Sequence, residues 1–155
     1  MIVQTKYFGE IDLSEDKIIT FENGLVGFEE FKKFTLLYDS EKESRANISW
    51  LQSLEEKTLA LPVINPFLVK EDYNPVVEDE LLKPLGDLTD DNVAILLVMT
   101  IPTDIKKMTA NLKAPLIINS DSRKGCQLIV ENQEYPIRYY MYEDFQSIKE
   151  KKGDE

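Results

Sequence analysis

The chain contains no histidine and a single cysteine, Cys126, among its 155 residues. Histidine titrates nearest to neutral pH, and it serves many metal sites and general-base mechanisms. The carboxylates, lysines and tyrosines that remain ionise far from pH 7. This composition therefore favours a binding protein over an enzyme, and it predicts no metal site and no cofactor.

Long apolar runs are also missing. The longest, Val93–Met99, is much shorter than the roughly 20 residues that cross a bilayer. The N-terminus lacks the basic and apolar segments of a signal peptide. A single cysteine cannot form an internal disulfide, as is usual in a reducing compartment. We therefore expect a cytoplasmic protein that makes no membrane contact and is monomeric when free.

Positive charge is scarce, with 18 Lys and Arg against 29 Asp and Glu and a formal net charge of −11. Eight of the acids fall between Glu71 and Asp91, where Lys83 is the only base. Such a chain repels phosphate backbones, which disfavours direct nucleic-acid binding. The same charge can attract a basic protein, although a solvated, solubilising loop is the alternative. The candidate acidic surface consists of Glu71, Asp72, Glu78, Asp79 and Glu80.

Short runs of β-branched and aromatic residues, separated by turn formers, predict many strands. The runs are Val3–Phe8, Ile18–Phe21, Phe34–Tyr38, Ile48–Leu51, Thr58–Ile64, Val93–Ile101, Leu116–Ile118, Gln127–Val130 and Ile137–Met141. Turns are expected at Glu22-Asn23-Gly24, Asp39-Ser40-Glu41 and Asn119-Ser120-Asp121.

Helical spacing is rare and marks only Gly27–Lys33 and Asp79–Leu85. The prediction is a mainly β, single-domain, antiparallel β-barrel-like fold with one or two short helices. Residues 1–142 form this domain, and residues 143–155 are expected to be a mobile, charged tail that frays or forms a loose helix.

Five residues are candidate partner contacts because they combine apolar anchors with amides that can pair with a peptide. They are Trp50, Gln52, Asn65, Phe67 and Asn111. Each has a structural alternative, since the aromatics can fill the core and the amides can hold turns. The prolines between Ile64 and Pro75 favour a shaped, non-helical connection there.

Gly24-Leu25-Val26-Gly27 has the glycine spacing of a phosphate loop only superficially, because no Gly-Lys-Ser/Thr follows and its flanks are acidic. We expect a tight turn that Phe21 and Phe28 hold against the core. Cys126 is expected in a strand without a reactive environment.

Four segments, in this order and spacing, resemble the FliW family of flagellar assembly factors over residues 3–140. Residues 78–91 and the C-terminal tail do not match residue by residue. The segments are Phe21…Gly24…Gly27-Phe28-Glu29, Trp50-Leu51-Gln52, Asn65-Pro66-Phe67…Tyr73, and Asn111-Leu112-Lys113-Ala114-Pro115…Asn119…Gln127.

The resemblance implies a small, mostly antiparallel β-barrel-like regulator in the cytoplasm that catalyses no reaction. It implies two alternate partners, flagellin and the RNA-binding translational repressor CsrA. Bound to CsrA, such a protein relieves repression of flagellin translation, and newly made flagellin competes for it. On this basis the acidic surface is expected to help exclude RNA as well as to bind CsrA.

Two other functions stay open at this point. A hydrolase or isomerase could use Asp90 and Asp91, or Glu29 and Glu30, but adjacent acids rarely form a matched acid and base. A small-ligand carrier would hold an apolar molecule inside the barrel. An open pocket in the barrel would favour that carrier.

Overall fold

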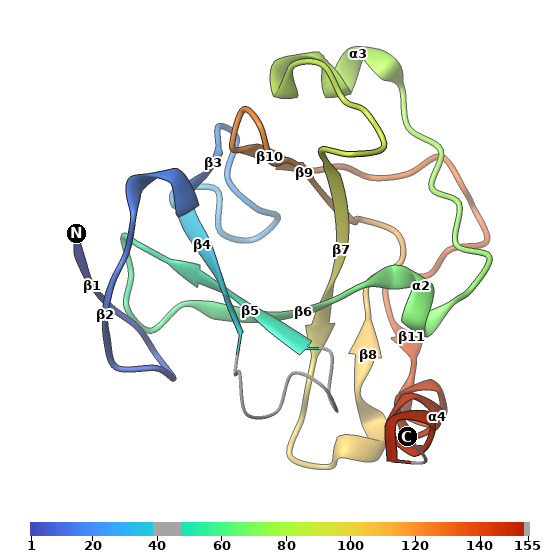
Figure 1. Cartoon of the computed structure of the whole chain (residues 1–155). Coiled ribbons are helices and arrows are strands. Elements are labelled where there is room, and N and C mark those ends of the chain that lie inside the picture. The colour runs from blue at the N-terminus through green and yellow to red at the C-terminus, as the bar shows by residue number, and fades with distance from the viewer. Residues whose placement is uncertain (39–47, 154–155) are drawn as a thin grey trace.

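The computed structural model describes residues 1–38 and 48–153, so the expected turn at Asp39-Ser40-Glu41 lies outside the described residues. Within them, seven strands close into a barrel, because β7 pairs with both β6 and β9 (Figure 1). The barrel strands are β3 (Ile19–Phe21), β4 (Lys33–Tyr38), β5 (Ile48–Ser53), β6 (Ala60–Ile64), β7 (Val93–Thr100), β9 (Leu116–Asn119) and β10 (Lys124–Gln127). The mainly β, barrel-like prediction is confirmed.

One pairing departs from the antiparallel expectation: β10 runs parallel to β3. The strand predicted at Gln127–Val130 is also misplaced, because β10 covers Lys124–Gln127 and shares only Gln127 with that run. Its first residues are Lys124 and Gly125, which carry no β signal. Gly125 is nevertheless suited to this position, because a Cβ there would lie 2.7 Å from the ring of Phe21.

Shorter strands extend the structure beyond the barrel. The hairpin of β1 (Ile2–Gln4) and β2 (Glu10–Asp12) is a separate sheet, and β8 (Thr109–Ala110) and β11 (Tyr139–Tyr140) continue from one side of β7. The sequence prediction missed β2 and β8, which are too short to show an alternating pattern. Short 3₁₀ helices η1 (Glu15–Lys17) and η3 (Ile105–Lys107) lie in the connections.

The helical predictions had mixed outcomes. Asp79–Leu85 is confirmed as α3 (Asp79–Leu82) followed by η2 (Lys83–Leu85). The helix at 27–33 is wrong, because Gly27 adopts φ +86° and the chain makes consecutive turns before β4. The non-helical connection is also wrong: α2 (Pro66–Val69) starts with a proline at a position that favours it.

Apolar side chains fill two adjacent cores. The barrel interior holds Phe21 and Phe34, whose rings pack edge to face at 5.5 Å. A second core lies between the outer face of β6 and β7 and the elements α2 and α4 (Tyr142–Gly153). Phe145 of α4 is buried in that second core, so the helix is anchored where the charged tail begins.

Candidate partner-binding surface

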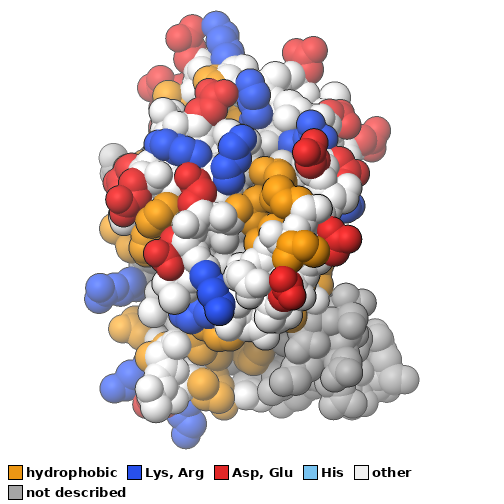
Figure 2. Space-filling view, turned by 90° about the vertical axis from the view of Figure 1, so that its left-hand side faces the viewer, with side chains coloured by type: hydrophobic (Ala, Val, Ile, Leu, Met, Phe, Trp, Pro, Cys, Tyr) orange, Lys and Arg blue, Asp and Glu red, His pale blue; other side chains and the backbone are white. Residues whose placement is uncertain are grey.

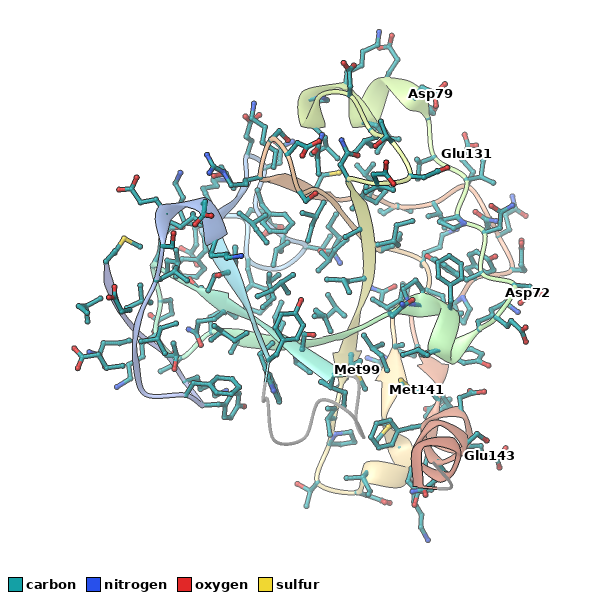
Figure 3. All side chains as sticks on the ribbon, in the orientation of Figure 1. Asp72, Asp79, Met99, Glu131, Met141 and Glu143 are labelled. Atoms are coloured by element: carbon teal, nitrogen blue, oxygen red, sulfur yellow. The ribbon has the colours of Figure 1, made fainter. Side chains whose placement is uncertain are left out.

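All eight acids of the segment 71–91 are exposed to solvent. Figure 3 shows Asp72 and Asp79 on the outside of the molecule, with their side chains directed away from the barrel. Lys70 Nζ lies 3.1 Å from Asp72 Oδ1, and this hydrogen bond lowers the pKa of the Asp72 carboxyl. Asp72 therefore stays ionised at neutral pH.

The part of this segment that contains α3 is fixed to the hairpin of β9 and β10. Leu85 is buried, and its carbonyl accepts hydrogen bonds from Asn119 Nδ2 at 2.8 Å and Ser122 Oγ at 2.7 Å. Asn119 Nδ2 also donates to the carbonyl of Asp87 at 3.1 Å. The buried amide of Asn119 therefore holds the end of η2, which continues directly from α3, beside the β9–β10 hairpin.

A glycine turn at residues 22–29 lies on the other side of β10. Gly24 adopts φ +68°, and a Cβ there would lie only 2.5 Å from the Cα of Glu29. The turn is fixed by Gln127, whose Oε1 accepts from the N–H of Val26 at 2.9 Å. Gln127 Nε2 donates to the carbonyl of Ala114, also at 2.9 Å. The expected tight turn is confirmed.

A groove of about 270 Å³ lies between these two walls, with β10 at its base. One wall exposes Leu81 (46%) and the other exposes Val26 (61%). The charged residues that line it are three glutamates and one lysine: Glu22, Glu29, Glu80 and Lys124. The groove thus combines apolar walls with an acidic rim.

The structure places Trp50 and Gln52 on the outer face of β5, beneath the N-terminal segment. Tyr7 packs against Trp50 with ring centroids 4.5 Å apart, which leaves the indole half-buried. Gln52 is only 1% exposed. Its Oε1 accepts from the N–H of Lys6, and its Nε2 donates to backbone carbonyls, including that of Leu59. A partner cannot reach Gln52 in this structure, so the expected contact does not fit its position.

The other three candidates lie elsewhere. Asn65 caps α2 by accepting from the N–H of Phe67 at 3.0 Å, and Phe67 itself is 51% exposed. Asn111 is half-buried and accepts from the N–H groups of Lys113 and Ala114. The asparagines therefore hold local backbone, as their alternative predicted, whereas Phe67 is available to a partner. The five candidates do not converge on one site.

Sequence reasoning missed Val26 and Leu81 as surface residues. A leucine pair within a run of acids is a signal that could have identified Leu81, because exposed apolar residues beside charge often mark an interface. Val26 gave no comparable signal. Its exposure follows from the path of the glycine turn, which only the folded structure defines.

The negative charge is not spread over the whole surface. Figure 2 shows Lys and Arg side chains gathered over the upper middle of one face of the molecule. A shallow hollow of about 310 Å³ contains Lys33, Arg123 and Lys124 among its lining residues. Glu15 also lines this hollow, and Lys124 lines both the hollow and the groove, so the basic region adjoins the acidic rim.

Membrane spans, metal clusters and activated nucleophiles mark other classes of protein. In residues 1–38 and 48–153 no helix is long and apolar enough to cross a membrane, and no group of three or more Cys, Asp or Glu residues is placed to hold a metal ion. Cys126 lies half-buried in β10, and burial raises its thiol pKa to about 11. The acid pairs Glu29–Glu30 and Asp90–Asp91 are exposed.

The barrel interior is filled by side chains, and the groove and the acidic helix α3 lie on its outside. The chain is therefore a small β-barrel domain whose candidate binding sites are on its outer surface. The sequence matches the family described as FliW protein over residues 2–141. The chain therefore belongs to the FliW family.

Individual relatives cover almost the whole chain. The flagellar assembly factor FliW of Lachnospira eligens is 59% identical, over 92% of this chain and 95% of that protein. Its counterpart from Lachnoclostridium phytofermentans is 52% identical, over 100% of this chain and 99% of that protein. A crystal structure of the flagellar assembly factor FliW superposes with a TM-score of 0.83 at 32% identity, covering 92% of this chain and 97% of that one.

Proposed function

We propose that this protein is a cytoplasmic flagellar assembly factor that binds flagellin and, alternately, the translational repressor CsrA. When it holds CsrA, flagellin translation is released from repression. When flagellin accumulates, it occupies the factor and frees CsrA. The protein catalyses no reaction in this scheme and acts by exchanging partners.

The observation that carries this proposal is the match to the FliW family over residues 2–141, supported by relatives that bear the name flagellar assembly factor FliW. The exposed acids add a physical reason. A repressor that binds RNA needs a basic face, and an acidic surface docked nearby disfavours phosphate there. The five acids of the candidate surface, at Glu71, Asp72, Glu78, Asp79 and Glu80, suit that role because all of them are exposed.

Among the candidate contacts, Phe67 has the geometry of an anchor. It stands exposed on α2, next to Leu68, which is 37% exposed. Trp50 can contribute the part of its ring that Tyr7 leaves uncovered. Asn65 and Asn111 are expected to act indirectly, by holding the backbone on which a partner rests.

The test uses purified protein with CsrA and flagellin of the same organism. Titration calorimetry should detect binding of each partner alone, and prior saturation with flagellin should abolish CsrA binding. In a gel-shift assay with the leader of flagellin mRNA, the protein should release CsrA from RNA. Replacing the five acids by lysine should weaken CsrA binding and RNA release, most strongly at low salt.

Absence of binding to both partners would overturn the proposal. If the lysine variant binds CsrA and releases RNA like the original protein at low salt, the electrostatic part is wrong. A small-ligand carrier is disfavoured because Phe21, Phe34 and their neighbours occupy the barrel interior. A metabolite that raises the melting temperature while both proteins are ignored would favour the carrier instead.

A further inference from the structure

We propose that the groove between α3 and the glycine turn receives an extended apolar segment of a protein partner, flanked by lysine or arginine, along the free edge of β10. This inference rests on the proposed function, and it assigns the groove to the basic RNA-binding partner. Three independent features of the groove support it: a strand edge, two apolar walls and an acidic rim.

The strand edge follows from the pairing of β10. Leu128 N–H donates to the carbonyl of Pro115 on the β9 side. Backbone groups of successive strand residues point to opposite sides, so those of Gln127 and Ile129 face away from β9. On that side, β3 runs beside β10 only as far as Gly125. In the described chain no strand lies next to residues 126–129 there, although the N–H of Glu131 further along donates to the carbonyl of Val76. The open edge is therefore short and consists of Gln127, the last residue of β10, and Ile129 just beyond it, which an added strand can use.

The walls provide contacts for side chains. Leu81 and Val26 are about half exposed on opposite sides, while Leu25 and Leu85 are buried beneath them. Exposed apolar side chains on both sides of one groove lose water when an apolar segment lies between them. The walls are also fixed in place, since Asn119 holds one and Gln127 holds the other. The groove is therefore formed before a partner binds, so binding carries little free-energy cost for ordering loops.

The rim selects the charge of the occupant. Among the residues that line the groove, three glutamates exceed one lysine, Lys124, which lies 3.4 Å from Glu22. Lys32 stands beside the rim, where its Nζ donates to the backbone carbonyl of Glu29 and leaves the carboxylate of Glu29 unpaired by that bond. Glu80 pairs with Lys83 at 3.0 Å, in a contact so exposed that an incoming cation can replace it. An acidic segment would meet repulsion here, whereas lysine or arginine beside the apolar residues would be attracted. This chemistry favours the basic partner over an uncharged or acidic peptide.

The test measures binding of purified CsrA to the full-length chain by calorimetry at physiological salt. The groove variant combines Glu80→Lys with Leu81→Arg. A matched control combines Glu134→Lys with Ile105→Arg, which adds the same charge at exposed positions away from the groove, since Ile105 is 48% exposed and Leu81 is 46% exposed. We expect the groove variant to weaken binding by at least about tenfold and the control by less than about threefold.

A second measurement detects the added strand itself. Amide hydrogen exchange at Gln127 and Ile129, whose backbone groups face away from β9, should slow by at least about fivefold when CsrA is bound. Circular dichroism and thermal melts of each variant confirm that it is folded. If the original protein binds neither CsrA nor flagellin, the proposed function fails. If it binds CsrA but the groove variant binds equally well, or the amides of Gln127 and Ile129 gain no protection, the groove assignment fails and the proposed function stands.

Discussion

Two glutamines perform the same task in two regions of this barrel with opposite results. Gln127 accepts from the N–H of Val26 and fixes the glycine turn, which leaves a groove open beside β10. Gln52 accepts from the N–H of Lys6 and fixes the N-terminal segment, which lays Tyr7 over Trp50. The amide of Gln127 thus holds one wall of an open groove, whereas the amide of Gln52 holds a segment that covers Trp50.

The difference shows that availability to a partner depends on the loop that an amide holds. Gln52 is buried because its segment lies flat on β5, whereas Gln127 is half-buried because the glycine turn leaves the strand edge uncovered. The sequence does not distinguish the two glutamines, because each lies at or near the end of a strand. A surface must therefore be assigned from the path of its loops, and separate variants in the two regions can test this.

The largest effect is expected in the glycine turn. Gly24→Ala would place a Cβ 2.5 Å from the Cα of Glu29 while also requiring a left-handed φ. We expect the free energy of unfolding to fall by about 3 kcal/mol or more, which equilibrium denaturation with urea would measure.

Gly27→Ala is the matched control for that variant. Gly27 has a similar φ of +86°, but nothing lies within 4 Å of the position that an alanine Cβ would take. Backbone strain alone then costs about 1–2 kcal/mol. Equal losses from the two substitutions would contradict the close packing of the turn against Glu29.

Replacing each glutamine by leucine compares the two regions directly. Gln52→Leu leaves the N–H of Lys6 and several carbonyls unpaired in a buried place, so we expect a loss of about 2–3 kcal/mol. Gln127→Leu breaks two bonds at a half-buried position, and we expect about 1 kcal/mol. Urea denaturation measures both losses. If Gln127→Leu were the more damaging, the groove wall would be more tightly integrated than its exposure indicates.

Uncovering Trp50 is expected to have a smaller effect. Tyr7→Ala removes a ring contact at 4.5 Å, which should cost about 1 kcal/mol. Trp50 is the single tryptophan, so its fluorescence reports the change and should shift to longer wavelength. Tyr140→Ala, at a 67% exposed position on β11, is the control and should leave the emission unchanged. An unshifted spectrum in Tyr7→Ala would mean that other groups shield the indole.

The sequence predicted six of the seven barrel strands well because their apolar character is a local property of the chain, whereas β10 shares only Gln127 with its predicted run. It failed at Gly27–Lys33, where paired phenylalanines suggested a helix but a left-handed glycine redirects the backbone. It also failed at Pro66–Val69, because the extended geometry that proline imposes on the residue before it holds at Asn65 but does not prevent a helix from starting at Pro66 itself. Both errors concern backbone geometry at a single residue, which periodicity does not report.

The candidate site was less predictable than the fold. The acidic segment was visible because charge is a property of composition, and its acids are indeed exposed. The groove was not visible, because Val26, Leu81 and Gln127 come together only when α3 and the glycine turn reach the same strand. The two side-chain amides Gln52 and Asn111 were candidate partner contacts, but both form hydrogen bonds with the protein's own backbone.

The smallest expected effect comes from Glu55, which connects the two regions. Its carboxylate accepts from the N–H groups of Lys33 and Lys32, which follow the glycine turn, while Glu55 itself lies in the connection from β5 to β6. These backbone hydrogen bonds lower the pKa of the Glu55 carboxyl below its ordinary value of 4.5. Because the folded-state pKa is lowered, the stabilisation is present above pH 4.5 and is lost as the pH falls through the folded-state pKa.

The Glu55 carboxylate is exposed, so solvent screening limits its contribution to the free energy of unfolding to about 0.5 kcal/mol. Glu55→Gln should therefore be slightly less stable than the original protein at pH 7, and the difference should vanish at strongly acidic pH in urea denaturation measured across that range. A difference that stays constant with pH would show that ionisation of Glu55 does not join the turn to the hairpin.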